Sequence, residues 1–452
     1  MEQQQQQTKL GINFGFRGWM LLIFEVTAYL VFQAFTNFPM NILADFYTGL
    51  PPEQAGAALA PLMTAGTLVG IVIQLILASF LGKMKSVKPM VLAFGCLTLL
   101  FALGVAALPF GPIWKASYFL VSVFANMYGM FGIGILIGQW FPTRKGVFMG
   151  IATFAFPVCN GLMGPFAALV FPANAAPNPL AGFLPFLIVG VIGWVIGLVF
   201  ISDYPEQVGC YRDNDKSFTK EKADAMLAEE IENKRTTVWT LGNTLKTGPF
   251  WLITIPMGTL LMCSVGMMTQ TNAIIGAYEG LDFGMVMGMV MIFAIIGSYA
   301  LGLVDGKFGT KAAILVSEIV MLISGILGGI GNQATAMISI ILLAIFMGAG
   351  SNFTVSGSAQ YWRREDFSTV FGVVNPVANV LQCIGPMVIA MTIGIGAGMG
   401  LGVTLPFWVT AAIAAVSIVL IVLFQPAKVK EADDKYRAAA GKPLDDALVG
   451  RK

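Results

Sequence analysis

Twelve long apolar runs constrain this chain more than any other feature of its sequence. A helix needs about 20 apolar residues to cross the hydrocarbon layer of a bilayer, where every backbone amide must be hydrogen-bonded internally. The chain is 57% hydrophobic and 11% charged, a ratio that a soluble domain cannot bury in a core. The runs lie at 17–41, 55–81, 88–110, 114–139, 146–172, 181–202, 248–275, 283–305, 311–331, 335–361, 368–395 and 403–424. They predict an all-α membrane protein with twelve transmembrane helices, embedded in a lipid bilayer.

Lysine and arginine are concentrated in alternate segments between these runs, which indicates the orientation, because short cytoplasmic loops retain basic residues. With the N-terminus inside, Lys115 is the one basic residue that falls outside. The inner basic residues are Lys9, Arg17, Lys83, Lys85, Lys88, Arg144, Lys145, Lys307, Lys311, Arg363 and Arg364, with those of 203–246 and of the tail after Pro426. We therefore expect a multi-pass protein of the cell membrane with both termini in the cytoplasm.

Composition argues against several other classes of protein. The net charge of +2 argues against a large nucleic-acid interface. The chain has no histidine, and its five cysteines are scattered without a C-x-x-C pair, so we expect neither a metal site nor a cofactor. The embedded carboxylates lie on separate helices, which does not favour an enzyme.

The polar stretch from Ser202 to Lys246 divides six runs from six. The predicted organisation is a cytoplasmic tail at 1–16, a six-helix bundle at 17–202, a cytoplasmic central loop at 203–247, a second bundle at 248–424 and a cytoplasmic tail at 425–452. Within the loop, the charged run 216–235 predicts a surface helix. The short, charged C-terminal tail is expected to be disordered.

Short sequence matches between the bundles predict two six-helix pseudo-repeats. Gln139-Trp140-Phe141 in the first bundle resembles Gln360-Tyr361-Trp362 in the second, and Gly164-Pro165 matches Gly385-Pro386 at the same offset. Pro157 and Asn160 resemble Pro376 and Asn379, two residues out of that register. We expect helices 5 and 11 to bend at the same depth, as rocking of two halves around a central site requires.

Two loops resemble those of a known family. Residues 302–311, GLVDGKFGTK, resemble the G-x-L-x-D-(R/K)-x-G-(R/K)-(R/K) loop of the major facilitator superfamily, with Asp305 one residue further from Gly309 than is usual. Residues 140–146, WFPTRKG, are similar to a turn of its oxalate/formate antiporter-like and monocarboxylate-porter-like members. The resemblance implies transport of an organic carboxylate by alternating access. The antiporter's basic residues have no counterpart, because 283–304 and 368–395 contain no lysine or arginine, which disfavours oxalate.

The resemblance also implies a gate on the cytoplasmic side. Carried over from the family's loop, Asp305 would lie near the start of helix 5, close to Arg144 and Lys145, and hold the two halves together. By the same logic, Lys83 and Lys85 of the first half would pair with the acidic residues Glu365 and Asp366 of the second. The alternative is that all these groups are solvated loop charges that fix the topology.

Glu25 is the embedded residue most suited to proton coupling, because an ionisable group inside a bilayer is costly unless paired or hydrated. It lies about 12 Å along the first helix from Arg17, at about 1.5 Å per residue. It begins a polar stripe that continues through Tyr29, Gln33, Thr36 and Asn37 at helical spacing. The alternative role for Glu25 is a structural hydrogen bond to a neighbouring helix. For the second embedded carboxylate, Glu318, a structural role of this kind is the one we expect.

Neutral polar residues on the helices expected to face the cavity are the candidate solute contacts. Asn160 and Asn379 have the strongest case, because a preceding proline opens each helix one turn earlier. The full set is Tyr29, Gln33, Asn37, Asn126, Asn160, Gln270, Tyr299, Asn352, Asn379 and Gln382.

The sequence thus predicts a secondary active transporter of a small organic solute, with a monocarboxylate or other amphipathic carboxylate favoured. We expect it to be monomeric and coupled to protons through Glu25. The alternatives are an exchanger or exporter of the same fold, and a membrane nutrient sensor that transports nothing.

Overall fold

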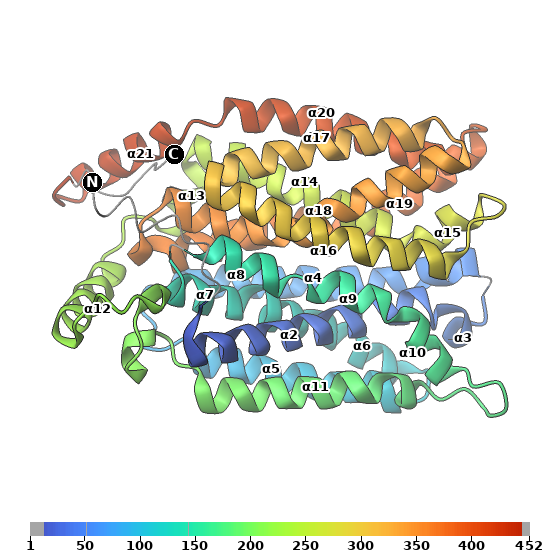
Figure 1. Cartoon of the computed structure of the whole chain (residues 1–452), viewed down its shortest axis with the longest axis horizontal. Helices are drawn as coiled ribbons and strands as arrows, with labels where there is room; N and C mark the ends of the chain where they lie inside the picture. Colours follow the sequence, from blue (N-terminus) through green and yellow to red (C-terminus); the bar gives the residue numbers. More distant parts are fainter. Residues whose placement is uncertain (1–12, 51, 143, 445–452) are drawn as a thin grey trace.

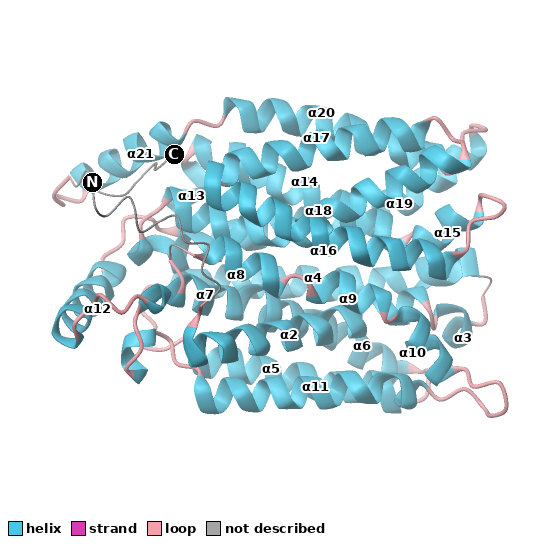
Figure 2. Ribbon diagram, in the orientation of Figure 1, coloured by secondary structure: helices cyan, strands magenta, loops and turns pink. Residues whose placement is uncertain are grey.

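The computed structural model describes residues 13–50, 52–142 and 144–444, without the side chains of 52–54, 56, 57, 145, 146, 348 and 349. The described chain is helical throughout and contains no strand (Figure 2). Eleven helices are long and apolar enough to cross a membrane, and a bent pair of helices makes a twelfth span. The predicted twelve-helix, all-α membrane fold is confirmed.

Six spans form the first half of the molecule. They are α2 (Gly15–Asn41), α4 (Pro52–Leu81), α5 (Lys88–Ala107), the continuous α6 (Pro112–Ala125), η2 (Asn126–Ile133) and α7 (Gly134–Trp140), the bent α8 (Lys145–Ala152), α9 (Ala155–Gly161) and α10 (Met163–Val170), and α11 (Pro179–Phe200). The short α3 (Ala44–Thr48) follows α2. Within the fourth span, η2 is a π-helix, a local widening that is common at functional sites.

The second half contains the other six spans. They are α14 (Gly248–Thr269) with the short α15 (Thr271–Gly276), α16 (Phe283–Phe308), α17 (Thr310–Gly329), α18 (Gln333–Tyr361), α19 (Arg364–Gly398) and α20 (Thr404–Leu423). Figure 1 shows that the two halves lie side by side with their helices along the long axis of the molecule. They meet along two seams, where α19 packs on α4 and α16 packs on α8 and α9.

The segment between the halves lies at the end of the bundle where the described chain begins, before α2, and ends, after Pro426–Ala439; we call it the termini end (Figure 1). It contains η3 (Pro205–Val208), η4 (Arg212–Asn214), α12 (Lys220–Arg235) and α13 (Leu241–Lys246). The helix α12 confirms the surface helix predicted at 216–235. Ala223, Leu227 and Lys234 are its buried residues, and their spacing places them on one face.

The C-terminal tail differs from its prediction, because residues Pro426–Ala439 form the helix α21. Its charge suggested disorder, but part of that charge is used in buried ion pairs. The Asp433 carboxylate is fully buried and bonds to Arg363 Nη2 at 3.3 Å, Arg437 Nε at 3.1 Å and Trp239 Nε1 at 2.8 Å. Those partners lie outside the tail or one turn along it, so local composition does not reveal them.

Of the two helices expected to bend alike, helix 5 is broken, whereas helix 11 is not interrupted. The pair Val147–Gly161 and Met163–Val170 is bent by 43°, whereas α19 continues as one helix through Pro376 and Pro386. The break at Leu162 lies between Gly161 and Gly164, and glycine weakens a helix. In helix 11, Gln382 occupies the position that corresponds to Gly161 in the repeat. Helix 11 therefore lacks one of these two glycines.

Candidate functional site: a central cavity closed at the termini end

A cavity lies between the two halves, in the part of the bundle away from the termini end. It encloses about 660 Å3 of space free of protein atoms, part of it open to solvent. Its position follows from its lining, because α2 and α14 both start at the termini end and contribute residues from their later turns. None of the described lining residues is charged.

The polar side of the cavity comes mainly from α2, through Gln33, Thr36, Asn37 and Asn41. These residues continue the stripe that the sequence predicted on this helix. Gln33 Nε2 donates to Asn160 Oδ1 at 2.9 Å, and Asn160 Nδ2 donates to the Met347 thioether at 3.6 Å. Asn160 therefore connects α2 and α9 of the first half to α18 of the second.

Two amide oxygens that border the cavity have no hydrogen-bond partner among the described residues. They are Asn37 Oδ1 on α2 and Gln382 Oε1 on α19, and both atoms are buried. Buried polar atoms are normally satisfied. A solute or water with a donor group can complete these two positions.

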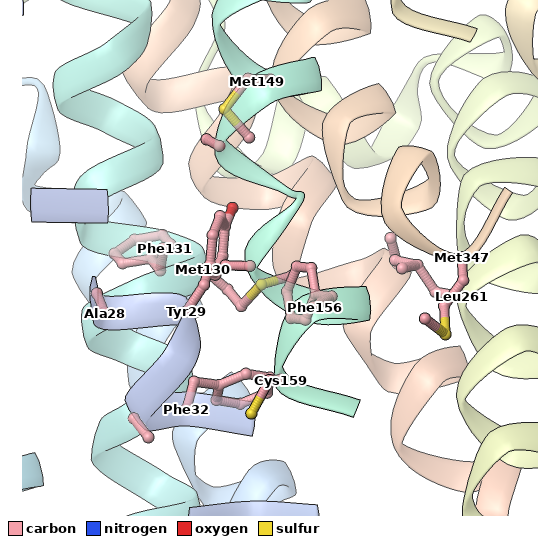
Figure 3. Packing of buried hydrophobic residues seen from close by; sticks show 14 of the residues in the cluster. Ala28, Tyr29, Phe32, Met130, Phe131, Met149, Phe156, Cys159, Leu261 and Met347 are labelled. Carbon is pink, nitrogen blue, oxygen red and sulfur yellow. The ribbon is translucent and has the colours of Figure 1, made fainter. Parts of the chain in front are cut away.

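Methionine and phenylalanine form the apolar side of the cavity. Figure 3 shows Phe32, Met130 and Phe156 gathered in the first half, with Leu261 and Met347 on the side of the second half. Among the described residues, six methionines line the cavity. The lining methionines are Met63, Met130, Met163, Met268, Met287 and Met347. Thioether side chains are flexible and polarizable, so this wall can adapt to solutes of different shape.

Of the ten predicted solute contacts, the structure brings Gln33, Asn37, Asn160 and Gln382 to the cavity. Tyr29 is buried beside it, with its ring 4.6 Å from that of Phe156. Asn352 donates to Thr153 Oγ1 across the halves at 3.2 Å.

The other four predicted contacts lie elsewhere. Asn126 Oδ1 accepts from Gln74 Nε2 at 2.5 Å inside the first half. Gln270 lies at the junction of α14 and α15, and Asn379 is buried within α19 without lining the cavity. Tyr299 is 48% exposed, on the outer surface of the protein. Helix spacing alone could not separate these environments, because each depends on the neighbouring helices.

Glu25 lies deeper than the cavity, on the side of the termini end. It is 0% exposed, and eight residues, or about 12 Å of helix, separate it from Gln33. Neither carboxylate oxygen has a partner in hydrogen-bond geometry among the described residues, although the Tyr29 hydroxyl one turn further on interacts with the carboxylate. Glu25 thus does not face the cavity in this conformation.

At the termini end, aromatic side chains of α19 fill small gaps in α7. A side chain of any size at Gly138 would overlap the Phe367 ring, because an added Cβ would lie 1.9 Å from Phe367 Cε1. One turn earlier, a Cβ on Gly134 would lie 2.8 Å from Phe371 Cζ. Two glycines four residues apart therefore let the two halves approach closely, as small-residue pairs do between membrane helices.

A polar network next to this contact is built around Arg364 at the start of α19. Arg364 Nη2 donates to the Gln139 carbonyl of the first half at 2.6 Å, and Nη1 pairs with Glu230 on α12 at 2.8 Å. Glu230 and Glu206 also pair with Arg212, at 2.6 and 3.0 Å. The central segment and both halves thus meet in one buried network, which we call the Arg364 network.

The predicted pairing of Asp305 with Arg144 and Lys145 stays a prediction. Asp305 is buried and accepts from Thr310 Oγ1 at 2.6 Å and from Ser356 Oγ. The Arg144 backbone N–H donates to Asp213 Oδ1 at 3.0 Å, and the side chain of Lys145 lies outside the described part of the chain.

Among the described residues, Lys83 and Lys85 form no ion pair with Glu365 or Asp366 in this conformation. Glu365 faces Arg437 at 3.7 Å, and Asp366 accepts from Thr237 Oγ1. Lys83 and Lys85 are exposed. The acidic residues therefore contact the central segment and the C-terminal helix, and no local sequence pattern predicted these contacts.

Lys234 on α12 borders a second, smaller cavity beside the Arg364 network. Burial lowers the pKa of its amine, and the charge of Asp203 partly opposes that shift. Burial also raises the pKa of nearby Tyr204 to about 12. Lys234 and Tyr204 are only 6% and 8% exposed, so the closed termini end excludes much of the solvent.

Comparison with known proteins settles the family. The model of the Major Facilitator Superfamily matches residues 26–386, most of the chain. The chain belongs to the Major Facilitator Superfamily. It is therefore a multi-pass membrane transporter with the fold of the secondary transporters, as the two loop resemblances implied; its subfamily is not fixed by this match.

Two solved structures share the fold over nearly their whole length. One is the proton:xylose symporter XylE bound to 6-bromo-6-deoxy-D-glucose, with a TM-score of 0.67, 13% identity, and coverage of 90% of this chain and 95% of that one. The other is the human organic anion transporter MFSD10 (TETRAN), with a TM-score of 0.66, 11% identity, and coverage of 89% and 98%. No significant match was found among curated protein sequences.

Proposed function

We propose that this member of the superfamily carries a small amphipathic organic solute through the central cavity, with a monocarboxylate as the favoured class and protons as the coupling ion. The observation that supports this is the two-sided cavity. Amides from α2 and α9 offer hydrogen bonds to a polar end, and methionine thioethers offer an adaptable surface to an apolar end.

The uncharged lining restricts how a carboxylate can bind. Without a lysine or arginine among the described lining residues, an anion would have to rely on amide N–H donors such as those of Gln33 and Asn160. A strongly charged dicarboxylate would lose its hydration without gaining an ion pair. A solute with at most one charge and an apolar body fits this cavity better.

The closed termini end and the cavity beyond it represent one state of an alternating-access cycle. Taking the basic termini end as cytoplasmic, this is the state closed to the cytoplasm. Opening of the termini end would separate α7 from α19 and expose the region around Glu25. In that state the Glu25 carboxylate can exchange a proton with water, which is the role we assign to it.

Transport in proteoliposomes tests this function directly. We would measure uptake of radiolabelled short-chain monocarboxylates and of their neutral amide analogues, with and without an inward proton gradient. We expect accumulation of at least one compound that collapses with a protonophore. No flux of any of these compounds would contradict the proposed solute class.

The Glu25→Gln variant tests the coupling. It should still exchange labelled for unlabelled solute, because the cavity is intact, but it should not concentrate the solute. Glu279→Gln, at an exposed position in the loop beyond α15, is the matched control and should concentrate normally. If Glu25→Gln concentrates like the wild type, the proton role of Glu25 is wrong.

A further inference from the structure

Glu318, the second embedded carboxylate, lies in a cluster of hydroxyl groups away from the cavity. It is 0% exposed and sits on α17, where its Oε1 accepts from Ser417 Oγ on α20 at 2.6 Å and from Thr259 Oγ1 on α14 at 3.2 Å. The two hydroxyl oxygens are 2.9 Å apart. Three helices of the second half therefore meet at this one side chain.

The other carboxylate oxygen of Glu318 is the unexplained atom of the cluster. Glu318 Oε2 is buried and has no hydrogen-bond partner among the described residues. The Thr410 hydroxyl, two turns from Ser417 on the same face of α20, is also buried and unbonded in the described structure. Cys263, one turn from Thr259, interacts with both Thr410 and Glu318.

No basic side chain of the described structure pairs with Glu318. On its own helix, Lys311 lies two turns away and donates its Nζ protons to the carbonyls of Phe424 at 2.7 Å and Val422 at 3.3 Å. The titratable and charged residues of the helices packed against α17 are Cys263 on α14, Tyr299, Asp305 and Lys307 on α16, and Tyr361 on α18, whereas α20 has none. Of these, Cys263 is the one that interacts with Glu318.

These contacts favour a proton over a metal cation. An ionised carboxylate between membrane helices, without a positive partner, is costly. Ser417 and Thr259 already form a hydrogen-bonded triangle with Oε1, so only Oε2 remains for a ligand, and one oxygen is too few for a metal ion. Uptake of H+ by Glu318 converts its carboxylate to a neutral carboxylic acid and leaves the triangle in place.

We propose that Glu318 is a second proton-binding site of this transporter, linked to the central cavity through α14. Thr259 and Leu261 lie two residues apart on that helix, so their side chains point to opposite faces. Thr259 bonds to Glu318, and Leu261 lines the cavity. Loss of the proton would place a charge between α14, α17 and α20 and loosen the attachment of α14, which forms part of the cavity wall.

Infrared difference spectroscopy of the purified protein can detect this proton without any solute and independently of the proposed function. A buried carboxylic acid has a C=O stretching band that disappears when the group ionises. We expect wild-type protein to lose such a band as the pH rises, and Glu318→Gln to lack it. Glu25→Gln, a matched change in the other embedded glutamate, should retain it. A band unchanged in Glu318→Gln, or one that never titrates, would overturn the proposal.

A milder variant covers the case in which Glu318→Gln fails to fold. Ser417→Ala keeps the carboxylate and removes a donor that stabilises its ionised form, so the band should titrate at higher pH. An unchanged titration midpoint in Ser417→Ala would also contradict the proposal.

Hydrogen–deuterium exchange tests the link to the cavity. After correction for intrinsic exchange, amides of 248–269 should exchange faster at high pH than at low pH in the wild type. This difference should vanish in Glu318→Gln and persist in Glu25→Gln. If α14 shows no such pH dependence in the wild type, Glu318 is not linked to the cavity.

Discussion

The two ends of the bundle differ in how the halves meet. At the termini end, phenyl rings pack into the glycine positions of α7, and Arg364 joins both halves to the central segment. Toward the other end, a cavity separates the halves, and Asn160 of the first half reaches Met347 of the second beside it. One end therefore holds the contacts that stabilise this conformation, and the other holds the residues suited to a solute. Mutations at the termini end should change stability and conformation before they change solute preference.

The largest effect is expected for Gly138→Val. The new side chain would overlap the Phe367 ring, and overpacking of a tight contact costs about 3 kcal/mol or more here, the upper part of the usual range. Thermal unfolding in detergent should show a large loss of stability. Phe367→Ala in the same chain should restore part of it, since the ring is the obstacle.

The control for that experiment is Gly164→Val, where no atom lies within 4 Å of the added Cβ. It should change stability by about 0.5 kcal/mol or less. An equal loss in both variants would mean that the contact at Gly138 is not what closes this end.

Arg364→Gln should have the next largest effect. It removes the bond to the Gln139 carbonyl and leaves Glu230 with Arg212 as a remaining partner, at a cost of about 2–3 kcal/mol. We also expect a wider distance distribution between spin labels at Lys85 and Lys307, with the exposed Cys96 replaced by serine. Arg235→Gln, which removes an exposed pair with Glu232, should change neither measurement. An unchanged distance distribution in Arg364→Gln would show that the network does not hold the halves together.

Asp433→Asn should have a smaller effect, confined to the C-terminal helix. Arg363 and Arg437 lose their shared buried carboxylate, at a cost of about 1–3 kcal/mol. Trypsin should then cut α21 faster at Lys428 and Lys435. Asp434→Asn, at a half-exposed pair with Lys430, should be cut like the wild type. Equal rates in all three proteins would contradict a docked α21.

The smallest effect is expected for Lys234→Met. Because burial lowers the pKa of this amine, the unfolded chain binds the proton more tightly, and wild-type stability should rise with pH toward the usual range of lysine. The methionine variant should lack this contribution and be more stable near neutral pH by up to about 1 kcal/mol. Unfolding temperatures measured across pH would show it, with the exposed Lys220→Met as the control. A pH dependence identical in all three proteins would mean that Lys234 is not desolvated in the folded state.

Several features could be predicted from the sequence because they depend on one helix at a time. Apolar length determines the spans, and the spacing of Gln33, Thr36 and Asn37 reveals a polar face on the first helix. The loop at Asp305 and the turn at 140–146 indicated the superfamily. The charged run at 216–235 was enough to predict α12.

Other features depend on which helices meet, and only the tertiary structure decided them. Tyr299 and Asn379 have the same kind of sequence setting as Gln33, but one is exposed and the other is buried within the bundle, because a neighbouring helix determines which face is covered. The methionine wall of the cavity likewise depends on which helices meet. The Arg364 network joins residues more than 130 positions apart, so no local pattern could reveal it. Glu25 and Glu318 look alike in the sequence as single embedded carboxylates. Helix packing gives them different surroundings: Glu25 lies between the cavity and the termini end without a hydrogen-bond partner among the described residues, whereas Glu318 lies in a cluster of hydroxyl groups.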